Sequence, residues 1–247
     1  MKRLYVLVPA AGSGTRFGAD QNKLFVDLCG QPVWTWTLGP VLRSNRIERV
    51  VLASSSTDRP RWNQELRRFH EDPASSVDSG ETAQSRFTVV DGGRTRTDSV
   101  IAMMAAIDDA ADEDLVAIHD AARPLCRMSE FMATVDAADR SGAAVLASPI
   151  AASLHRRVGD GSVPVDRNEM FAAATPQVFR VGLFRRAIKR HNGRPATDDA
   201  TLVSRTGHPV TIVPGGADNL KITVPEDLAI AAAILANRRT DDHTTPQ

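Results

Sequence analysis

The chain has 247 residues, of which 42% are hydrophobic and 24% charged. This composition is typical of one globular domain with a buried core and excludes a mainly disordered chain. The 30 lysines and arginines balance 30 aspartates and glutamates, so no overall positive field exists to hold a nucleic acid polymer. We expect no membrane association, because no apolar run approaches the roughly 20 residues needed to span a bilayer. Two cysteines and a start that leads straight into a strand-like run are typical of a reduced, cytoplasmic protein.

Short apolar runs rich in β-branched residues alternate with amphipathic segments along the first 150 residues. We expect strands over residues 4–9, 50–53, 87–90, 115–119 and 143–150. Apolar residues at three- and four-residue spacing predict helices over residues 33–42, 61–69, 99–111 and 129–138. This alternation indicates an α/β fold with parallel strands and crossover helices, in which ligands bind at the carboxyl ends of the strands.

The alternation breaks after residue 150. Residues 153–166 predict two polar strands around Gly159-Asp160-Gly161, a turn signal for a hairpin too polar for a core. Because a two-stranded ribbon alone is only marginally stable, we expect it to pack on a second copy of the chain as a homodimer, with an ordinary surface hairpin as the alternative. We therefore interpret residues 1–237 as one domain, with 151–168 as a protruding dimerisation arm and 238–247 as a polar tail.

The last third of the chain returns to the α/β pattern. Its periodicity predicts helices over residues 183–191 and 198–205, strands over 210–213 and 220–223, and a closing helix over 225–237. Pro225, Glu226 and Asp227 fit the first turn of that helix, where a missing amide is tolerated and negative charge is favourable.

A glycine-rich segment, Pro9 to Gly18, follows the first expected strand. Small residues and free amides make such a turn a concave anion site, so we interpret it as a phosphate cradle. Its glycine spacing fits neither the dinucleotide fingerprint nor a P-loop. Two cations, Arg16 and Lys23, distinguish it from an ordinary glycine-rich turn, because displacement at phosphorus builds charge that a guanidinium and an ammonium can neutralise.

Two further strand ends carry candidate ligand groups. Asp120 can hold Mg²⁺ while substrate phosphates complete the octahedron, or it can simply cap a helix. Its neighbour His119 is expected to be structural, with a hydrogen bond to the main chain. Gly92 and Gly93 let the main chain abut a planar base, with Ser99 adding a hydroxyl; a capped strand-to-helix turn is the alternative.

These motifs follow one another along the chain together with several others. They are Gly12-Ser13-Gly14 with Arg16 and Lys23, Gly92-Gly93 with Arg96 and Asp98-Ser99-Val100, His119-Asp120-Ala121-Ala122-Arg123-Pro124, Thr175-Pro176-Gln177, Thr197-Asp198-Asp199-Ala200, Asn219-Leu220-Lys221-Ile222-Thr223 and Pro225-Glu226-Asp227-Leu228. Over about residues 3–236 the chain closely resembles the 2-C-methyl-D-erythritol 4-phosphate cytidylyltransferase family. The resemblance implies a Rossmann-like, mixed but mostly parallel sheet with flanking helices, of the nucleotidyltransferase and GT-A-like kind, plus a small β-arm. It also implies cytidylyl transfer from CTP to a methylerythritol phosphate in isoprenoid precursor synthesis, Mg²⁺ dependence and a homodimer.

Carried over position by position, the resemblance also implies roles for single residues. Arg16 and Lys23 would stabilise the transition state, and Arg167 and Lys221 would hold the sugar phosphate. The expected substrate contacts are Ala10, Ala11, Gly12, Ser13, Gly93, Ser99, Asp120, Ala121, Ser153 and Thr197, and Asp120 is also the expected Mg²⁺ ligand. Two departures from the family pattern are Ala152, where we expect an aspartate, and Asn22-Lys23-Leu24, where many members have Pro-Lys-Gln.

The expected reaction is an in-line attack by a phosphate oxygen of the acceptor on the α-phosphorus of CTP, which expels pyrophosphate. A phosphate monoester is largely dianionic at neutral pH, so no general base is needed, and the cations must converge on one pocket. Three alternatives remain open. They are a ribitol-5-phosphate cytidylyltransferase, a sugar-nucleotide-dependent glycosyltransferase, for which Asp198-Asp199 would be a poor metal motif, and a catalytically inert nucleotide-binding regulator.

Overall fold

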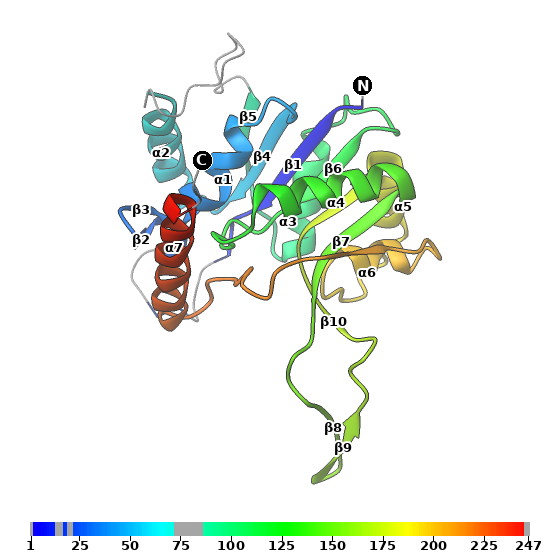
Figure 1. Cartoon of the computed structure of the whole chain (residues 1–247). Helices are drawn as coiled ribbons and strands as arrows, with labels where there is room; N and C mark the ends of the chain where they lie inside the picture. The colour runs from blue at the N-terminus through cyan, green and yellow to red at the C-terminus, as the bar shows by residue number, and fades with distance from the viewer. Residues whose placement is uncertain (1, 13–16, 19–21, 72–85, 245–247) are drawn as a thin grey trace.

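A seven-stranded sheet forms the centre of the computed structural model, which describes residues 2–12, 17–18, 22–71 and 86–244, with side chains up to residue 238 (Figure 1). The strands lie in the order β11-β7-β10-β6-β1-β4-β5. Their bounds are Leu4–Pro9 for β1, Arg49–Ser54 for β4, Phe87–Asp91 for β5, Leu115–Ile118 for β6, Ala143–Pro149 for β7, Phe171–Arg180 for β10 and Thr211–Pro214 for β11.

The sheet is mixed but mostly parallel, as the resemblance implied. β1 pairs in parallel with β4 and β6, β4 with β5, and β7 with β11, whereas β10 runs antiparallel to both β6 and β7. The sequence pattern missed β10, because its first half is rich in alanine and Pro176 follows at its middle, both of which weaken a strand signal. The register of β10 shifts between Ala173 and Gln177, which places Thr175 beside the end of β6.

Helices cover both faces of the sheet. One face carries α1 (Val33–Arg43), α2 (Arg59–Glu71), α4 (Met128–Ser141) and α7 (Glu226–Thr244), and the other carries α3 (Arg96–Ala105), α5 (Val181–Arg190) and α6 (Asp199–Ser204). Side chains of β1 alternate between the two cores, with Val6 and Val8 in one and Tyr5 and Leu7 in the other. Burial on both faces explains the continuous apolar run of this strand.

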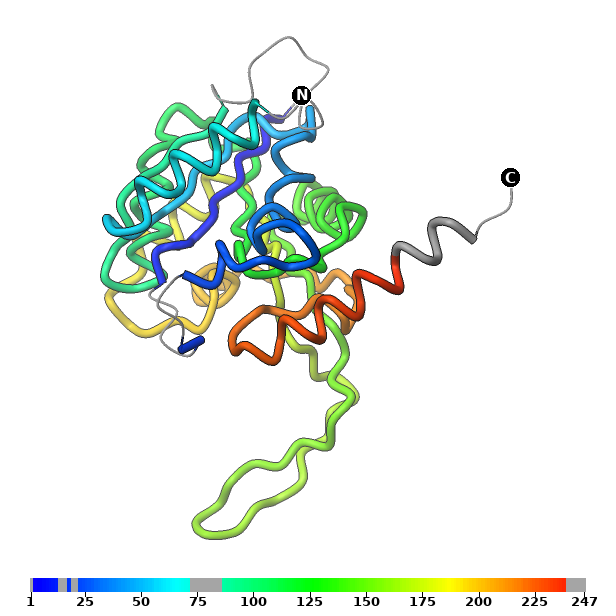
Figure 2. The backbone as a smooth tube through the Cα atoms, turned by 90° about the vertical axis from the view of Figure 1, so that its left-hand side faces the viewer, coloured from blue at the N-terminus to red at the C-terminus, as the bar shows by residue number. Residues whose placement is uncertain are grey.

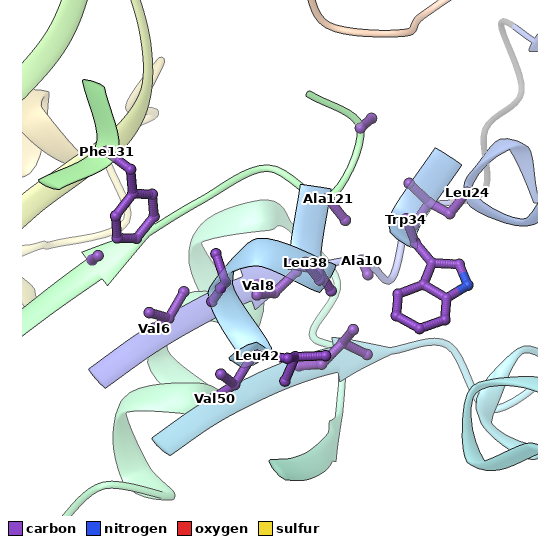
Figure 3. Packing of buried hydrophobic residues seen from close by; sticks show 14 of the residues in the cluster. Val6, Val8, Ala10, Leu24, Trp34, Leu38, Leu42, Val50, Ala121 and Phe131 are labelled. Carbon is purple, nitrogen blue, oxygen red and sulfur yellow. The ribbon is translucent and has the colours of Figure 1, made fainter. Parts of the chain in front are cut away.

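The core reaches the edge of the sheet where β1 and β6 end. There α1 packs over Ala10 and Ala121, with Trp34 and Leu24 beside them (Figure 3). Trp34 is 1% exposed, and burial of a ring this large stabilises the fold by a few kcal/mol. The hydroxyl of Thr37 in α1 also donates to the carbonyl of Ala121 at 2.9 Å. The loops at this edge therefore rest on a rigid support.

Two strands beyond the sheet, β8 (Leu154–Val158) and β9 (Gly161–Val165), pair as the expected hairpin. Gly159 in the turn has a φ of 58°, a conformation that glycine adopts without strain. The hairpin projects well away from the sheet (Figures 1 and 2). It and its base expose the apolar side chains of Val158, Val163, Met170 and Phe171.

Two details near the C-terminus differ from expectation. Residues 220–223 pair with no strand but form an extended loop that lies against the end of β6, because the main chain of Ile222 donates to the carbonyl of Ala122 at 2.8 Å. The closing helix runs on to Thr244 instead of Asn237, since neither glycine nor proline interrupts it before Pro246. Among the described helices, none combines the length and apolar character needed to cross a bilayer.

Candidate functional site

A cavity of about 480 Å³ opens at the carboxyl ends of β1, β5 and β6, the edge where the α/β pattern places ligands. Its walls come from five separate segments of the chain. They are Pro9, Ala10, Ala11 and Gly12; Asn22, Lys23 and Leu24; Gly93, Arg94, Thr95, Arg96 and Ser99; Asp120, Ala121 and Ala122; and Lys221 and Thr223.

The main chain after β1 forms one wall and is held close to the loop after β5. The amide of Gly92 donates to the carbonyl of Ser54 at 2.8 Å, and a Cβ at Gly92 would lie 2.1 Å from that of Ala11. Only glycine allows this approach. At Gly12, by contrast, an added Cβ would meet no atom of the described residues within 4 Å, so this backbone borders space in which a ligand fits.

The loop after β5 leads directly into α3. Thr95 caps the helix in a reciprocal arrangement with Asp98, which stabilises a helix start. The Ser99 hydroxyl accepts from the Gly93 amide and donates to the Thr95 carbonyl, both at 3.0 Å. Its only hydrogen is thus used within the protein, so Ser99 fixes the shape of this wall and can offer a ligand only a lone pair.

Lys23 is placed in the cavity by a short 3-10 turn, η2 (Lys23–Phe25). Asn22 caps this turn by accepting from the Leu24 amide and is itself tied to Asp58 at 2.9 Å. Leu24 and Phe25 are buried in the core. The ammonium group of Lys23 donates to the carbonyl of Ile222 at 2.5 Å, so the second and last segments of the cavity wall meet at this lysine.

Asp120 is surrounded by three cations, Lys221, Arg123 and Arg96. Its Oδ2 is 2.9 Å from Lys221 Nζ and 3.4 Å from Arg123 Nε, and its Oδ1 is 3.7 Å from Arg96 Nε. Burial by itself would raise the pKa of Asp120, but the charges of Lys221, Arg96 and Arg123 outweigh it and hold that pKa well below its ordinary value. The carboxylate is therefore ionised and nearly fully buried.

Groups behind Asp120 fix its orientation. The Thr175 hydroxyl accepts from the Asp120 amide and lies 3.0 Å from Nδ1 of His119. Burial lowers the pKa of His119 to about 4, so the ring is neutral and its Nδ1 can accept the hydroxyl hydrogen. His119 thus has a structural environment, although its partner is a side chain and not the expected main chain. Arg123 also donates to the carbonyl of Asn219 at 2.8 Å, which ties the last loop to this one.

The expected site residues divide into three groups. Nine line the cavity: Ala10, Ala11, Gly12, Lys23, Gly93, Ser99, Asp120, Ala121 and Lys221. Ser13 and Arg16 lie outside the described residues. Ser153, Arg167 and Thr197 are not among the lining residues. Arg167 lies at the base of the arm, where its guanidinium donates to the carbonyl of Ala151.

Sequence reasoning assigned no role to several residues that line the cavity, above all Arg94, Thr95, Arg96 and Thr223. Arg96 stood inside a recognised motif, two residues after Arg94, but only the fold brings it to Asp120. The signal that could have found it is its position at a strand-to-helix turn beside the two glycines.

Asp120 is also the residue that could hold a metal ion. Within the described residues, no group of three or more His, Cys, Asp or Glu side chains could do so alone. One ionised carboxylate at the wall of this cavity nevertheless fits Mg²⁺, which is commonly bound by one or two carboxylates, substrate phosphates and water. Asp120 would hold such an ion together with the phosphates of a nucleotide.

The mixed sheet and the cationic cavity at its carboxyl edge place the chain among the α/β nucleotidyltransferases. The sequence profile of the 2-C-methyl-D-erythritol 4-phosphate cytidylyltransferase family, IspD, matches residues 4–237. The chain belongs to this family, and it is a cytidylyltransferase. The resemblance seen in its motifs is therefore confirmed.

Relatives support this assignment over nearly the whole chain. A 2-C-methyl-D-erythritol 4-phosphate cytidylyltransferase from Rhodopirellula baltica is 43% identical over 245 residues, with 96% of each chain covered. The crystal structure of the enzyme of that name from Thermus thermophilus is 31% identical, with a TM-score of 0.69 over 94% of this chain and 98% of the other. A structure from Anaerococcus prevotii, a 4-diphosphocytidyl-2C-methyl-D-erythritol synthase, is 24% identical with a TM-score of 0.79 over 95% and 96%, and supports the fold alone.

Proposed function

We propose that this chain transfers the cytidylyl group of CTP to 2-C-methyl-D-erythritol 4-phosphate, releasing pyrophosphate, in the non-mevalonate route to isoprenoid precursors. The observation that carries the proposal is the convergence of Lys23, Lys221 and Asp120 on one cavity, because this reaction must bring two polyanions together. The names of the curated relatives agree with this acceptor. None of those three names favours ribitol 5-phosphate.

On the nucleotide side, the proposed contacts are main-chain groups. The backbone at Ala10, Ala11 and Gly12 would lie along the triphosphate, and Gly93 would face the base, with Ser99 holding that loop in place. Lys23 would neutralise charge that develops on the oxygens around the α-phosphorus, as would Arg16. Ser13 and Thr197 complete the proposed substrate contacts.

On the acceptor side, Lys221 would hold the phosphate monoester close to the α-phosphorus. The monoester is already deprotonated at neutral pH, and the cavity supplies cations where its two substrates repel each other. Mg²⁺ held by Asp120 and the phosphates would supply further charge neutralisation.

The proposed roles of Arg167 and Ser153 require a second copy of the chain. Both residues belong to the arm and neither lines the cavity of its own chain. The arm also exposes Val158 and Val163, an arrangement that favours association. We therefore include a homodimer in the proposal, with the arm of one subunit reaching the site of the other. A cytoplasmic location completes it.

One assay tests the central claim. Pyrophosphate release is measured with CTP, Mg²⁺ and either 2-C-methyl-D-erythritol 4-phosphate or ribitol 5-phosphate, and we expect a kcat/KM at least about 100-fold higher for the first acceptor. Equal or reversed preference would overturn the acceptor assignment. Binding of CTP without turnover of either acceptor would instead support the inert nucleotide-binding protein. Light scattering measures the oligomeric state of the chain and of an Arg167→Gln variant. Kinetics of mixtures of variants then test whether the arm of one subunit contributes to the site of the other.

A further inference from the structure

Arg96 lies between two carboxylates at the wall of the cavity. Its Nη1 is 2.7 Å from Oδ2 of Asp199, and its Nε is 3.7 Å from Oδ1 of Asp120. The side chain is about one-third exposed, with a relative accessibility of 32%, and it lines the cavity. One edge of the guanidinium is thus held by protein while another is available to a ligand.

Asp199 is the residue that holds Arg96 in this position. It is the first residue of α6 and is 1% exposed. Burial raises the pKa of Asp199, and the nearby Asp120 and Asp198 add to that effect, while Arg96 opposes it. Among the described residues Arg96 is its one ion-pair partner. A buried ion pair of this kind contributes little net stability compared with apolar side chains of similar volume, so its presence calls for another explanation.

The explanation lies in the geometry around Asp120. Lys221 faces Oδ2 and Arg96 faces Oδ1 of the same carboxylate, so the two cations are neighbours. An anion that lies against Lys221 therefore also lies within reach of Arg96. Without Asp199, the guanidinium would be free to close the 3.7 Å gap to Asp120 and form a direct ion pair, which would remove its donors from the cavity.

We propose that Arg96 binds the phosphate group of the acceptor together with Lys221, and that Asp199 is the positioning residue that keeps Arg96 turned to the cavity. This inference rests on the proposed function, because it assigns Lys221 to the acceptor side. It adds a second, planar donor group to that side of the site. A guanidinium can give a phosphate two parallel hydrogen bonds, which fixes its orientation as well as its position.

The first test is an Arg96→Gln variant with an Arg96→Lys companion. We expect Arg96→Gln to raise the KM for 2-C-methyl-D-erythritol 4-phosphate by about tenfold or more, as loss of a charge-assisted hydrogen bond does, with the KM for CTP changed less than about twofold. Arg96→Lys should recover part of this loss, because it retains the charge without the fork. An unchanged acceptor KM, or a loss that falls on CTP instead, overturns the proposal.

The second test separates positioning from a structural role. Asp199→Asn keeps the side-chain shape and should raise the acceptor KM in the wild-type background, but should add nothing in an Arg96→Gln background. Equal losses in both backgrounds would mean that Asp199 does not act through Arg96. If Asp199→Asn alone proves too unstable to assay, the double variant, which leaves no unpaired buried charge, is compared with Arg96→Gln.

Arg49→Gln is the matched control. Arg49 forms an ion pair with Asp109 at 3.0 Å at the amino end of β4, the opposite edge of the sheet. We expect its loss to change stability only slightly and neither KM at all. The outcome for the wild type separates the two levels of inference. If the wild-type chain turns over no polyol phosphate, the proposed function fails; if it does and Arg96→Gln behaves like wild type, only this inference fails.

Discussion

The ammonium group of Lys23 donates a hydrogen bond to the carbonyl of Ile222 across 199 positions of sequence, at 2.5 Å. Lys221 directly precedes Ile222, and its own ammonium group contacts Asp120. The two lysines proposed for opposite sides of the reacting phosphorus are therefore attached to the same short loop. This loop is in turn tied to the end of β6 by Arg123 and by the Ile222 amide, so movement of one wall of the site must involve the other.

Replacing Lys23 tests its role in the transition state. In Lys23→Ala we expect kcat to fall by about 100- to 1,000-fold, as removal of a group that stabilises developing charge does, while CTP affinity changes little. Steady-state kinetics with titration of CTP separate the two effects. Lys2→Ala, which removes a lysine paired with Asp139 on the surface, serves as the control. A kcat equal to that of wild type would show that Lys23 has no part in the chemical step.

Lys221→Ala should have a different kinetic signature. We expect the KM for the acceptor to rise about tenfold or more, with the KM for CTP close to that of wild type, because Lys221 holds only one substrate. The fold should survive, since Arg96 and Arg123 still face the buried Asp120 carboxylate. A variant whose defect appears in CTP binding would place Lys221 on the nucleotide side instead.

The sequence was informative about the fold where the physical signal is local. The apolar run of β1 was predicted with its observed bounds, Leu4 to Pro9, because burial on both faces leaves a continuous hydrophobic pattern. The hairpin around Gly159 was predicted from turn residues. β10 was missed, since a strand rich in alanine and interrupted by proline is defined by the neighbours that pair with it, and these are distant in sequence.

The same distinction applies to the site. Asp120 was predicted because it stands at a strand end beside small residues, and Lys23 because it follows the glycine-rich segment after the first strand; both are local patterns. The Arg96–Asp199 pair joins positions 103 residues apart, and nothing in either segment predicts the other. Arg167 was expected in the pocket but does not line it. The sequence could not predict this, because a linear sequence does not say whether an arm serves its own subunit or a partner.

Gly12 in the cavity wall and Gly92 behind it should respond oppositely to the same added methyl group. At Gly92 the new Cβ would clash with Ala11, so Gly92→Ala should destabilise the protein by about 1–3 kcal/mol. At Gly12 the new Cβ would meet no atom within 4 Å in the described part of the chain, so Gly12→Ala should leave stability unchanged and weaken CTP binding by crowding the ligand. Urea unfolding and calorimetric titration with CTP measure the two effects.

Gly161→Ala is the control for both, because its Cβ would have ordinary contact only, 3.8 Å from the carbonyl of Val158 in the arm. It should leave both stability and CTP affinity at wild-type values. Normal CTP affinity in Gly12→Ala would mean that this stretch of main chain does not border the bound nucleotide.

His119 should make the stability of the protein depend on pH. Burial lowers its pKa from 6.5 to about 4 in the folded state, so the unfolded chain takes up a proton first as the pH falls. The stability that neutral His119 provides is complete above pH 6.5 and is lost as the pH drops toward 4. The full loss amounts to about 3 kcal/mol.

His119→Asn, which retains a polar group for Thr175, should flatten the fall in unfolding free energy between about pH 6.5 and 4.5. His155→Asn, on the exposed arm, should keep the wild-type slope. Other buried groups titrate alike in all three proteins, so the difference between the slopes reports His119 alone. Parallel curves for His119→Asn and wild type would show that His119 is as readily protonated in the folded chain as in the unfolded one.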